Sequence, residues 1–176
     1  MLKIYEYRRF FYPIIIVIVV GAWFYCYFSK SQVTTVILVR HADRTGESLN
    51  ALGLARAQEL SRVLEECNIS AIYASNIPRT QETAQPLADH LSLTLNIYDP
   101  ANLAALAEDI KSNHRGEVVL VVGHSDTVTP TIGLLGISPQ PDLIPPSEFD
   151  HLYIVTFGRC IYPRLLKMEY GANTPL

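Results

Sequence analysis

Short apolar runs alternate along residues 33–176 with segments in which apolar residues recur at the spacing of a helix. Residues 33–39 and 118–122 are continuous runs of apolar or β-branched residues, which favour strands that are buried on both faces. Further strands are expected at residues 70–74, 93–98 and 152–157 and in the C-terminal stretch.

Helices are expected between these strands. Residues 50–67 form an amphipathic pattern that starts at Asn50, a residue type that caps helices. Its expected apolar face, at i, i+3, i+4 and i+7, consists of Leu60, Val63, Leu64 and Cys67. Other helices are expected at residues 78–91 and 102–113, and a last one ends near residue 135. This order predicts one α/β domain over residues 31–176, a three-layer sandwich with a largely parallel sheet.

The first thirty residues form a separate unit. Residues 10–28 contain no charged side chain, and at about 1.5 Å per residue such a helix nearly crosses a hydrocarbon core of about 30 Å. Aromatic side chains gather at both ends of the run, as in the interfacial belts of membrane helices. The alternative is a cleaved secretory signal, but no small-residue cleavage site follows. We therefore expect residues 1–30 to be a cytoplasmic stub and an N-terminal transmembrane helix.

The charges that flank this apolar run predict its orientation. Lys3, Arg8 and Arg9 precede the run, whereas Lys30 alone follows it closely. Positive charge is retained on the cytoplasmic side, so we expect a single-pass membrane protein with a cytoplasmic N-terminus. The globular domain would then face the periplasm or another extracytoplasmic space.

The globular part of the chain is acidic. Residues 31–176 carry ten Lys or Arg against sixteen Asp or Glu, which argues against a nucleic-acid partner. Cys67 and Cys160 could pair in an oxidising compartment, but they show no metal or redox spacing, and we expect ordinary buried thiols. Residues 138–147 are rich in proline and are expected to form a surface loop.

Both buried runs end in a histidine. Arg40 and His41 follow the first run, and His124 follows the second. Ligands of open α/β sheets bind beyond the carboxyl ends of the strands, so both histidines are expected at one crevice. Arg79 lies just inside a predicted helix start, where free backbone N–H groups favour an anion. Each residue alone could be an ordinary hydrogen-bonded or solvated side chain, but their convergence indicates a phosphate site.

Four segments of the chain resemble a known family. They are "VRHADR" at residues 39–44, "LNALGLARAQEL" at 49–60, "IYASNIPRTQETA" at 72–84 and "VVLVVGHSDTV" at 118–128. The first is similar to the RHG signature of the histidine phosphatase superfamily, and the others resemble the segments that follow it in the same order. The chain therefore resembles the phosphoglycerate mutase-like branch of that superfamily, and its short phosphatase members in particular.

The resemblance implies a role for each residue of the crevice. His41 would be the nucleophile that accepts the phosphoryl group, and Arg40, Arg79 and His124 would bind its oxygens. An adjacent guanidinium disfavours an imidazolium, so His41 should stay neutral near about pH 7. Fixed cationic donors stabilise the charge of the transition state. We expect no metal and no cofactor, because the sequence shows no carboxylate cluster to hold an ion.

Two features depart from the family pattern. Ala42 stands where the signature has glycine. The usual glutamate general acid has no clear match, and its region offers Asp99, Glu108 and Asp109, the last two of which also suit a solvated helix face.

Asp126 is the expected general acid, because it lies two positions after His124, a spacing that resembles the His-x-acid arrangement of some phosphatases in the second branch of the superfamily. The alternatives are that Asp126 caps a helix, or that Asp43 supplies the proton.

The expected function is that of a membrane-anchored phosphomonoesterase or phosphohistidine phosphatase with a phosphohistidine intermediate. Three alternatives stay open: a catalytically idle, membrane-tethered module that binds phosphate, a phosphoglycerate mutase-type phosphotransferase, and an intramembrane interaction protein. A mutase would need a second recognition surface, and no extra basic cluster provides one. The sequence does not distinguish sugar phosphate, nucleotide, lipid-linked phosphate and phosphoprotein substrates, and it leaves the oligomeric state open.

Overall fold

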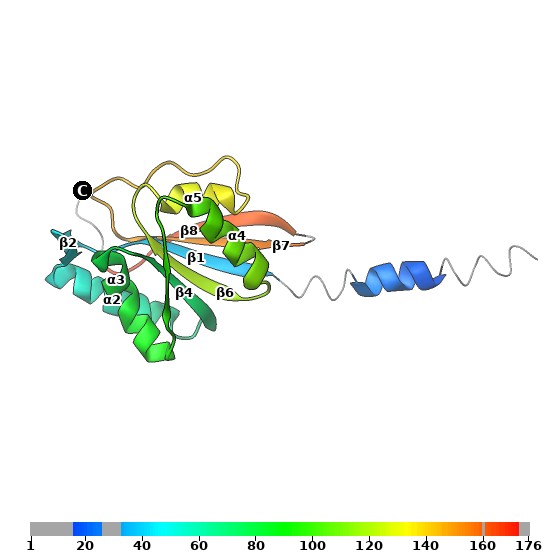
Figure 1. Cartoon of the computed structure of the whole chain (residues 1–176), viewed down its shortest axis with the longest axis horizontal. Coiled ribbons are helices and arrows are strands. Elements are labelled where there is room, and N and C mark those ends of the chain that lie inside the picture. The colour runs from blue at the N-terminus through cyan, green and yellow to red at the C-terminus, as the bar shows by residue number, and fades with distance from the viewer. Residues whose placement is uncertain (1–15, 26–32, 160, 173–176) are drawn as a thin grey trace, which may run out of the picture.

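A six-stranded sheet forms the centre of the molecule (Figure 1). The computed structural model describes residues 16–25, 33–159 and 161–172. The strand order is β5-β4-β6-β1-β7-β8; the first four strands are parallel, β7 runs antiparallel to β1, and β8 runs antiparallel to β7. The parallel strands are β1 (Thr34–Arg40), β4 (Ile69–Ser75), β5 (Leu95–Tyr98) and β6 (Val118–Gly123), followed by β7 (His151–Gly158) and β8 (Ile161–Glu169).

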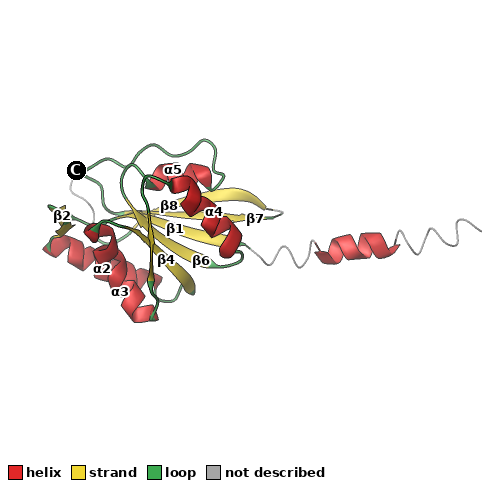
Figure 2. Cartoon of the chain, viewed as in Figure 1, coloured by secondary structure: helices red, strands yellow, loops and turns green. Residues whose placement is uncertain are grey.

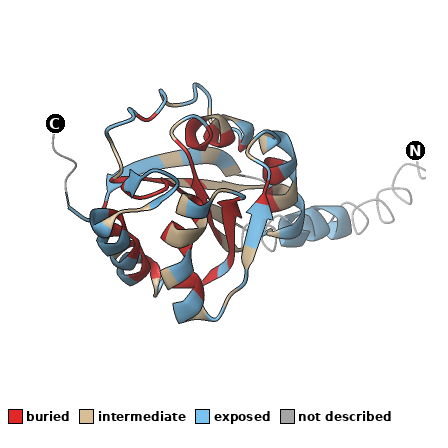
Figure 3. Cartoon of the chain, turned by 60° about the vertical axis from the view of Figure 1, so that its left-hand side comes forward, coloured by how far each residue is buried: buried red, intermediate tan, exposed pale blue. Residues whose placement is uncertain are grey.

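Helices cover both faces of the sheet and complete the predicted three-layer sandwich (Figure 2). One face packs against α2 (Ala51–Leu64) and α3 (Pro78–Leu91), and the other against α4 (Leu103–Asn113) and α5 (Val128–Leu134). Each face has its own apolar core, because successive side chains of a strand point to opposite sides. Figure 3 shows the buried residues along the strands and on the inner sides of the helices. The predicted α/β architecture is confirmed.

The start of α2 is as predicted, but its buried face is not. The Asn50 side chain accepts a hydrogen bond from the Gly53 backbone N–H at 2.9 Å, so the predicted cap is confirmed. Leu60 and Leu64 are buried as expected, whereas Val63 is 39% exposed. The helix ends at Leu64, and the face that meets the sheet is centred on Gly53, Arg56, Ala57, Leu60, Ser61 and Leu64. Val63 follows Leu60 by three positions and lies at the edge of this buried face, so its side chain is partly exposed to solvent.

The prediction of two buried thiols is also wrong for Cys67. It is a free cysteine that follows the end of α2 and is only partly buried. Cys160 lies outside the described residues, so the possible pairing of these two cysteines stays untested.

A short hairpin that the sequence pattern did not predict follows β1. It pairs β2 (Arg44–Thr45) with β3 (Ser48–Leu49). The Leu49 backbone N–H donates to the Glu82 carboxylate at 2.7 Å, and the Arg79 N–H donates to the Glu47 carbonyl at 3.1 Å. The hairpin is therefore fixed against the first turns of α3.

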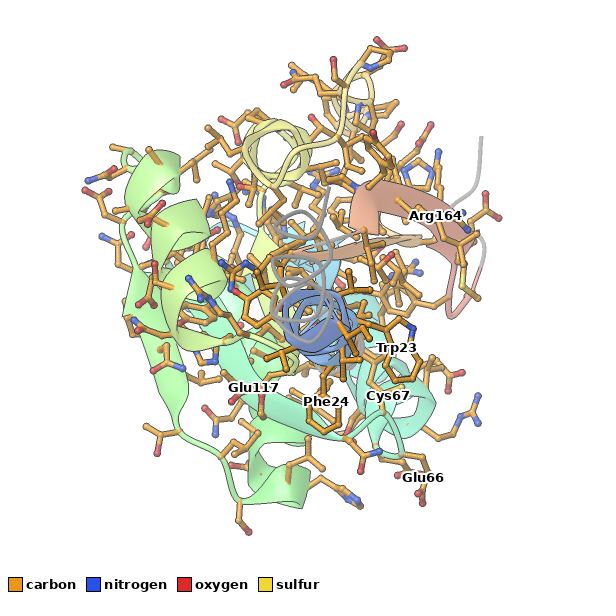
Figure 4. The ribbon with its side chains drawn as sticks, turned by 90° about the vertical axis from the view of Figure 1, so that its right-hand side faces the viewer. Trp23, Phe24, Glu66, Cys67, Glu117 and Arg164 are labelled. Carbon is orange, nitrogen blue, oxygen red and sulfur yellow. The ribbon has the colours of Figure 1, made fainter. Side chains whose placement is uncertain are left out.

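The helix of residues 16–25 lies beyond the end of the sheet at which β1 begins (Figure 1). Residues 16–25 are helical, and the rest of the predicted span of residues 10–28 lies outside the described residues. Within the described part of the chain, no helix combines the length and the apolar character needed to cross a membrane. Figure 4 views the domain from this end and labels Trp23 and Phe24 of the helix together with Glu66, Cys67 and Glu117 of the domain.

Candidate active site

Neighbouring parallel strands bring the two predicted histidines together. β1 and β6 pair in register, with Arg40 opposite Gly123, so the next residues of the two strands leave the same edge of the sheet. The His41 N–H donates to the Gly123 carbonyl at 2.9 Å, and the His41 and His124 rings lie 5.5 Å apart between centroids. The predicted crevice at the strand ends is therefore present.

His41 is held in one tautomer. Its Nδ1 lies 2.8 Å from the Ala42 carbonyl oxygen, which can only accept, so Nδ1 carries the hydrogen and Nε2 has the free lone pair. Burial, reinforced by the charges of Arg40 and Arg79, lowers the pKa of His41 to about 3. The side chain is 2% exposed and neutral over the physiological range. A neutral imidazole with a free Nε2 is the form that can attack phosphorus.

Ala42 serves in place of the glycine of the RHG signature without backbone strain. Its φ angle lies outside the left-handed region that favours glycine. The Ala42 N–H donates to the Thr83 hydroxyl at 2.9 Å, which fixes the carbonyl that orients His41. The alanine is therefore compatible with the site.

Arg79 and His124 contact each other. Arg79 follows Pro78 in the first turn of α3, and its Nη2 lies 3.3 Å from Nδ1 of His124. The Nε2 atom of His124 lies 2.9 Å from the Ser75 hydroxyl at the end of β4. Burial lowers the pKa of His124 to about 4, and the charge of Arg79 acts in the same direction. Both rings of the site are thus neutral in the absence of an anion.

Arg40 has a second task besides the predicted contact with phosphate. Its Nη1 donates to the carbonyls of Pro145, Pro146 and Glu148 at 3.1, 2.8 and 2.8 Å. The guanidinium stacks on Phe149 at 4.1 Å, and that ring lies 5.9 Å from the ring of His41. Arg40 therefore ties the proline-rich loop and its aromatic neighbour to the nucleophile.

The Nε atoms of Arg40 and Arg79 are both buried without a hydrogen-bond partner among the described residues. Burial lowers the pKa of Arg40 to about 10 and also lowers that of Arg79. Two desolvated guanidinium groups, each with a donor unused among the described residues, form a site suited to an anion with several oxygens.

Asp126 is an exposed carboxylate whose charge acts on the residues of the site. Helix α5 takes Thr127 as its N-cap without a side-chain capping bond, so the capping alternative for Asp126 is wrong. Burial lowers the pKa of His124, and the Asp126 carboxylate opposes that shift, which places its charge beside the site. The same charge acts on Arg40 and Arg79.

The other acidic candidates have structural partners. Asp43 is buried and accepts a hydrogen bond from Arg56 Nε at 2.7 Å. Asp99 caps a turn by accepting from the Ala101 N–H at 2.9 Å. On α4, Glu108 accepts from Ser112 and Asp109 accepts from Tyr73 and Asn113.

Several site residues had no clear signal in the sequence. Ser75 and Thr80 flank the helix start that carries Arg79, but buried hydroxyls have no characteristic spacing. Phe149 reaches the nucleophile from a loop far along the chain. Arg44 stands on the unpredicted hairpin, and its charge adds to burial in lowering the pKa of both Arg40 and Arg79. The position of Arg44 three residues after His41 was the one available hint.

Metal-binding groups do not gather here. Within the residues that the structure covers, no three His, Cys, Asp or Glu side chains lie close enough to hold a metal ion. Independence from metal stays a prediction.

The fold is an α/β sandwich in which two neutral histidines and two arginines gather at the carboxyl ends of neighbouring strands, and comparison with known proteins shows what it resembles. Residues 36–104 match the family model of the histidine phosphatase superfamily (branch 1). The match includes Arg40, His41 and Arg79 and ends before His124, which β6 brings to the same crevice. The predicted resemblance to this superfamily is confirmed. No curated protein matches the sequence.

Solved structures of similar fold include phosphatases and a mutase. The mycobacterial glucosyl-3-phosphoglycerate phosphatase bound to VO3 has a TM-score of 0.59 at 14% identity, with 78% of this chain and 99% of that chain covered. The phosphoserine phosphatase of Entamoeba histolytica gives 0.54 at 15% identity, covering 80% and 98%. The phosphoglycerate mutase of Plasmodium falciparum gives 0.54 at 18% identity, covering 82% and 94%. At these identities the likeness shows the fold.

The two histidines of the site, His41 and His124, predict how stability depends on pH. Their pKa values are about 3 and about 4 in the folded protein, against about 6.5 in an unfolded chain. Between these values the unfolded chain binds protons that the folded protein does not, so stability should fall as the pH is lowered from about 6.5 toward about 4. Each histidine can add a slope of up to about 1.4 kcal/mol per pH unit. Urea unfolding at a series of pH values measures it.

The controls for this prediction are asparagine variants. His41→Asn and His124→Asn should each flatten the pH dependence of the unfolding free energy. His90→Asn should leave it unchanged, because the side chain of His90 is 54% exposed on α3. A slope that survives both site substitutions would show that other groups cause the acid sensitivity.

Proposed function

We propose that the protein is a metal-independent phosphomonoesterase that acts through a phosphohistidine at Nε2 of His41. The observation that carries the proposal is the fixed tautomer of His41, whose Nδ1 donates to the Ala42 carbonyl and whose Nε2 is left free. The Nε atoms of Arg40 and Arg79 are buried without a partner among the described residues, and the charges of both arginines act on His41. The match of residues 36–104 to the branch 1 family model and a fold shared with phosphatases support the same reaction class.

The proposed reaction has two steps. Nε2 of His41 attacks phosphorus, the bond to the leaving oxygen breaks, and Asp126 gives that oxygen its proton. Water then attacks the phosphohistidine, Asp126 takes the proton of the water, and the P–N bond breaks to release phosphate and neutral His41. Arg79, Arg40 and His124 hold the equatorial oxygens, on which negative charge accumulates.

Turnover of an aryl phosphate by the full chain tests this function. Hydrolysis separates an enzyme from an idle phosphate-binding module, which would bind phosphate and turn nothing over.

A phosphoglycerate mutase-type reaction is the second candidate, since a mutase shares the fold. A phosphohistidine substrate would use the same two steps, with an imidazole as the leaving group.

We predict that Asp126→Asn slows hydrolysis of an alkyl phosphate by about 10²-fold or more, because an alkoxide needs a proton to leave. Hydrolysis of a nitrophenyl phosphate should barely slow, since nitrophenolate leaves without one. Steady-state kcat values for both substrates measure the difference.

Glu108→Gln is the matched control, because Glu108 is an exposed carboxylate of α4 and should leave both rates unchanged. Equal slowing of both substrates by Asp126→Asn would mean that Asp126 has a structural task. No slowing of either would return the acid role to Asp43, Asp99 or Glu108, and loss of the alkyl phosphatase rate in Glu108→Gln would then identify Glu108.

We also propose that residues 10–28 anchor the protein in a membrane with the domain on the extracytoplasmic side. Support comes from the uncharged run and from Lys3, Arg8 and Arg9 before it. Residues 16–25 lie beyond the end at which β1 begins, whereas the crevice lies at the opposite end of β1 (Figure 1). In that arrangement the active site would face away from the membrane.

A reporter fused after Leu176 tests the topology. We predict that a reporter active only outside the cytoplasm works there and that a cytoplasm-restricted reporter does not. Arg8 and Arg9 changed together to Glu should increase the fraction of inverted protein, because the charge bias that sets the orientation is weakened. Activity of the cytoplasmic reporter on the unchanged chain would contradict the proposed orientation.

A further inference from the structure

One ring nitrogen of His124 faces a group that can only donate a hydrogen bond, and the other faces a hydroxyl that can accept one. Nδ1 lies 3.3 Å from Nη2 of Arg79, and a guanidinium can only donate, so Nδ1 must offer a lone pair. Nε2 lies 2.9 Å from the Ser75 hydroxyl. A neutral ring with a lone pair on Nδ1 carries its hydrogen on Nε2. The Ser75 oxygen therefore accepts that hydrogen.

The hydrogen-bond partners of Ser75 also require that His124 donates to Ser75. Its hydroxyl lies 2.9 Å from that of Thr80, and the Thr80 hydroxyl is in turn 2.8 Å from the Ile77 carbonyl and 3.1 Å from the Ser75 carbonyl. Carbonyls only accept, so the Thr80 hydrogen points to them and Thr80 accepts the hydrogen of Ser75. The chain of donation runs from His124 through Ser75 to Thr80 and ends on backbone. Ser75 and Thr80 are both fully buried, so water cannot replace a lost partner.

The hydrogen bonds from His124 through Ser75 to Thr80 leave a neutral His124 unable to donate a hydrogen bond to phosphate. The oxygens of a phosphate dianion accept hydrogen bonds, and the atom of His124 beside Arg79 is Nδ1, which has no hydrogen. Reversing these hydrogen bonds would require Ser75 to donate to Nε2 of His124 and Thr80 to stop donating to the two backbone carbonyls. The remaining route is the addition of a proton at Nδ1.

We propose that Ser75 and Thr80 are positioning residues that fix the Nε2–H tautomer of His124, so that His124 takes up one proton at Nδ1 whenever a tetrahedral dianion binds. The proton comes from solvent, forms the Nδ1–H bond and leaves the ring as an imidazolium. Arg79 then transfers its donation from Nδ1 to an oxygen of the anion. The inference rests on the proposed phosphate site.

The charges around His124 agree with uptake on binding. Without a ligand, burial holds the pKa of His124 at about 4, and the cations Arg79, Arg40 and Arg44 act in the same direction against the carboxylate of Asp126. The neighbouring His41 is neutral and adds no charge. A dianion beside Nδ1 supplies the negative charge that the empty site lacks, so it raises the affinity of the ring for a proton.

Binding of tungstate tests the proposal, because tungstate is a tetrahedral dianion that carries no proton of its own near about pH 7.5. Calorimetric titration of the full chain in buffers of different ionisation enthalpy gives the number of protons exchanged. We expect uptake of about one proton per tungstate. His124→Asn should bind tungstate more weakly and take up none.

Thr80→Val and Thr80→Ser separate positioning from mere packing. Valine keeps the shape but removes the acceptor of Ser75, whose hydroxyl is then free to donate to Nε2 and to allow a neutral Nδ1–H ring. Proton uptake should fall below about half a proton in Thr80→Val and stay near about one in Thr80→Ser. Nitrogen NMR of the imidazole should show both ring nitrogens protonated in the tungstate complex of the unchanged protein.

Tight tungstate binding without proton uptake by the unchanged protein would overturn the proposal and leave the phosphatase function intact. A neutral Nδ1–H ring in the NMR spectrum of that complex would do the same. Failure to bind tungstate at all would overturn the phosphate site itself. Normal proton uptake together with no turnover of any phosphate ester would instead contradict the proposed function alone.

Discussion

His41→Ala is expected to lower kcat for an aryl phosphate by at least about 10³-fold, because it removes the atom that attacks phosphorus. No neighbour can replace that atom. His124 presents its Nδ1 to Arg79 and its Nε2 to Ser75, so neither of its nitrogens has the free lone pair that His41 has at Nε2. Binding of tungstate should persist, since Arg40 and Arg79 are unchanged. Steady-state kinetics and calorimetry on the same preparation measure both effects.

His90→Ala provides the control for this variant. It removes an exposed imidazole near the end of α3, which among the described residues has an ionic contact only with Glu65, at 3.8 Å. Turnover by His90→Ala should equal that of the unchanged protein. If His41→Ala kept more than about a tenth of the original kcat, another group would be the nucleophile.

Arg79→Gln is expected to lower kcat by about 10²- to 10³-fold, the usual effect of removing one donor from a preorganised anion site. Arg79 has a buried Nε without a partner among the described residues, and it lies in the first turn of α3 beside His124. Glutamine keeps a hydrogen-bond donor but loses the charge and the planar fork. The pKa of His124 should rise in this variant, because one of the cations that depress it is gone.

The matched control is Arg62→Gln, since Arg62 is an exposed arginine of α2 paired with Glu59. It should leave kcat unchanged. An Arg79→Gln variant that raised KM and kept kcat would mean that Arg79 binds substrate and transition state equally. That result would remove Arg79 from the proposed stabilisation of the transition state.

The position of the site could be read from the sequence because strand ends have a strong signature. A continuous apolar run that stops at a charged residue marks the end of a buried strand, and two such runs put His41 and His124 at one edge. Pro78 marks the first turn of α3 and so places Arg79 at its start. These signals are local, and the register of β1 against β6 brings the local pieces together.

The internal chemistry of the site could not be read in the same way, because it depends on contacts between residues that are distant in the chain. The partners of Arg40 lie more than a hundred positions away, in a loop whose sequence indicates only that it lies on the surface. Asp43 forms an ion pair with Arg56 of α2. The start of α2 packs so closely against the backbone of Asp43 that a side chain at Gly53 would collide with the Asp43 carbonyl. The tautomer of His41 depends on a hydrogen bond to the Ala42 carbonyl oxygen, and a backbone carbonyl gives no signal in the pattern of apolar and polar residues.

Trapping of the phosphoenzyme tests the central claim most directly. The full chain would be mixed with a phosphate ester labelled on phosphorus, quenched within the steady state and divided between acid and alkali. We predict that label stays on the protein in alkali, is lost in acid and is absent from His41→Ala, since a phosphoramidate at Nε2 has that stability. Label that survives acid, or turnover by His41→Ala with label still on the protein, would contradict the account.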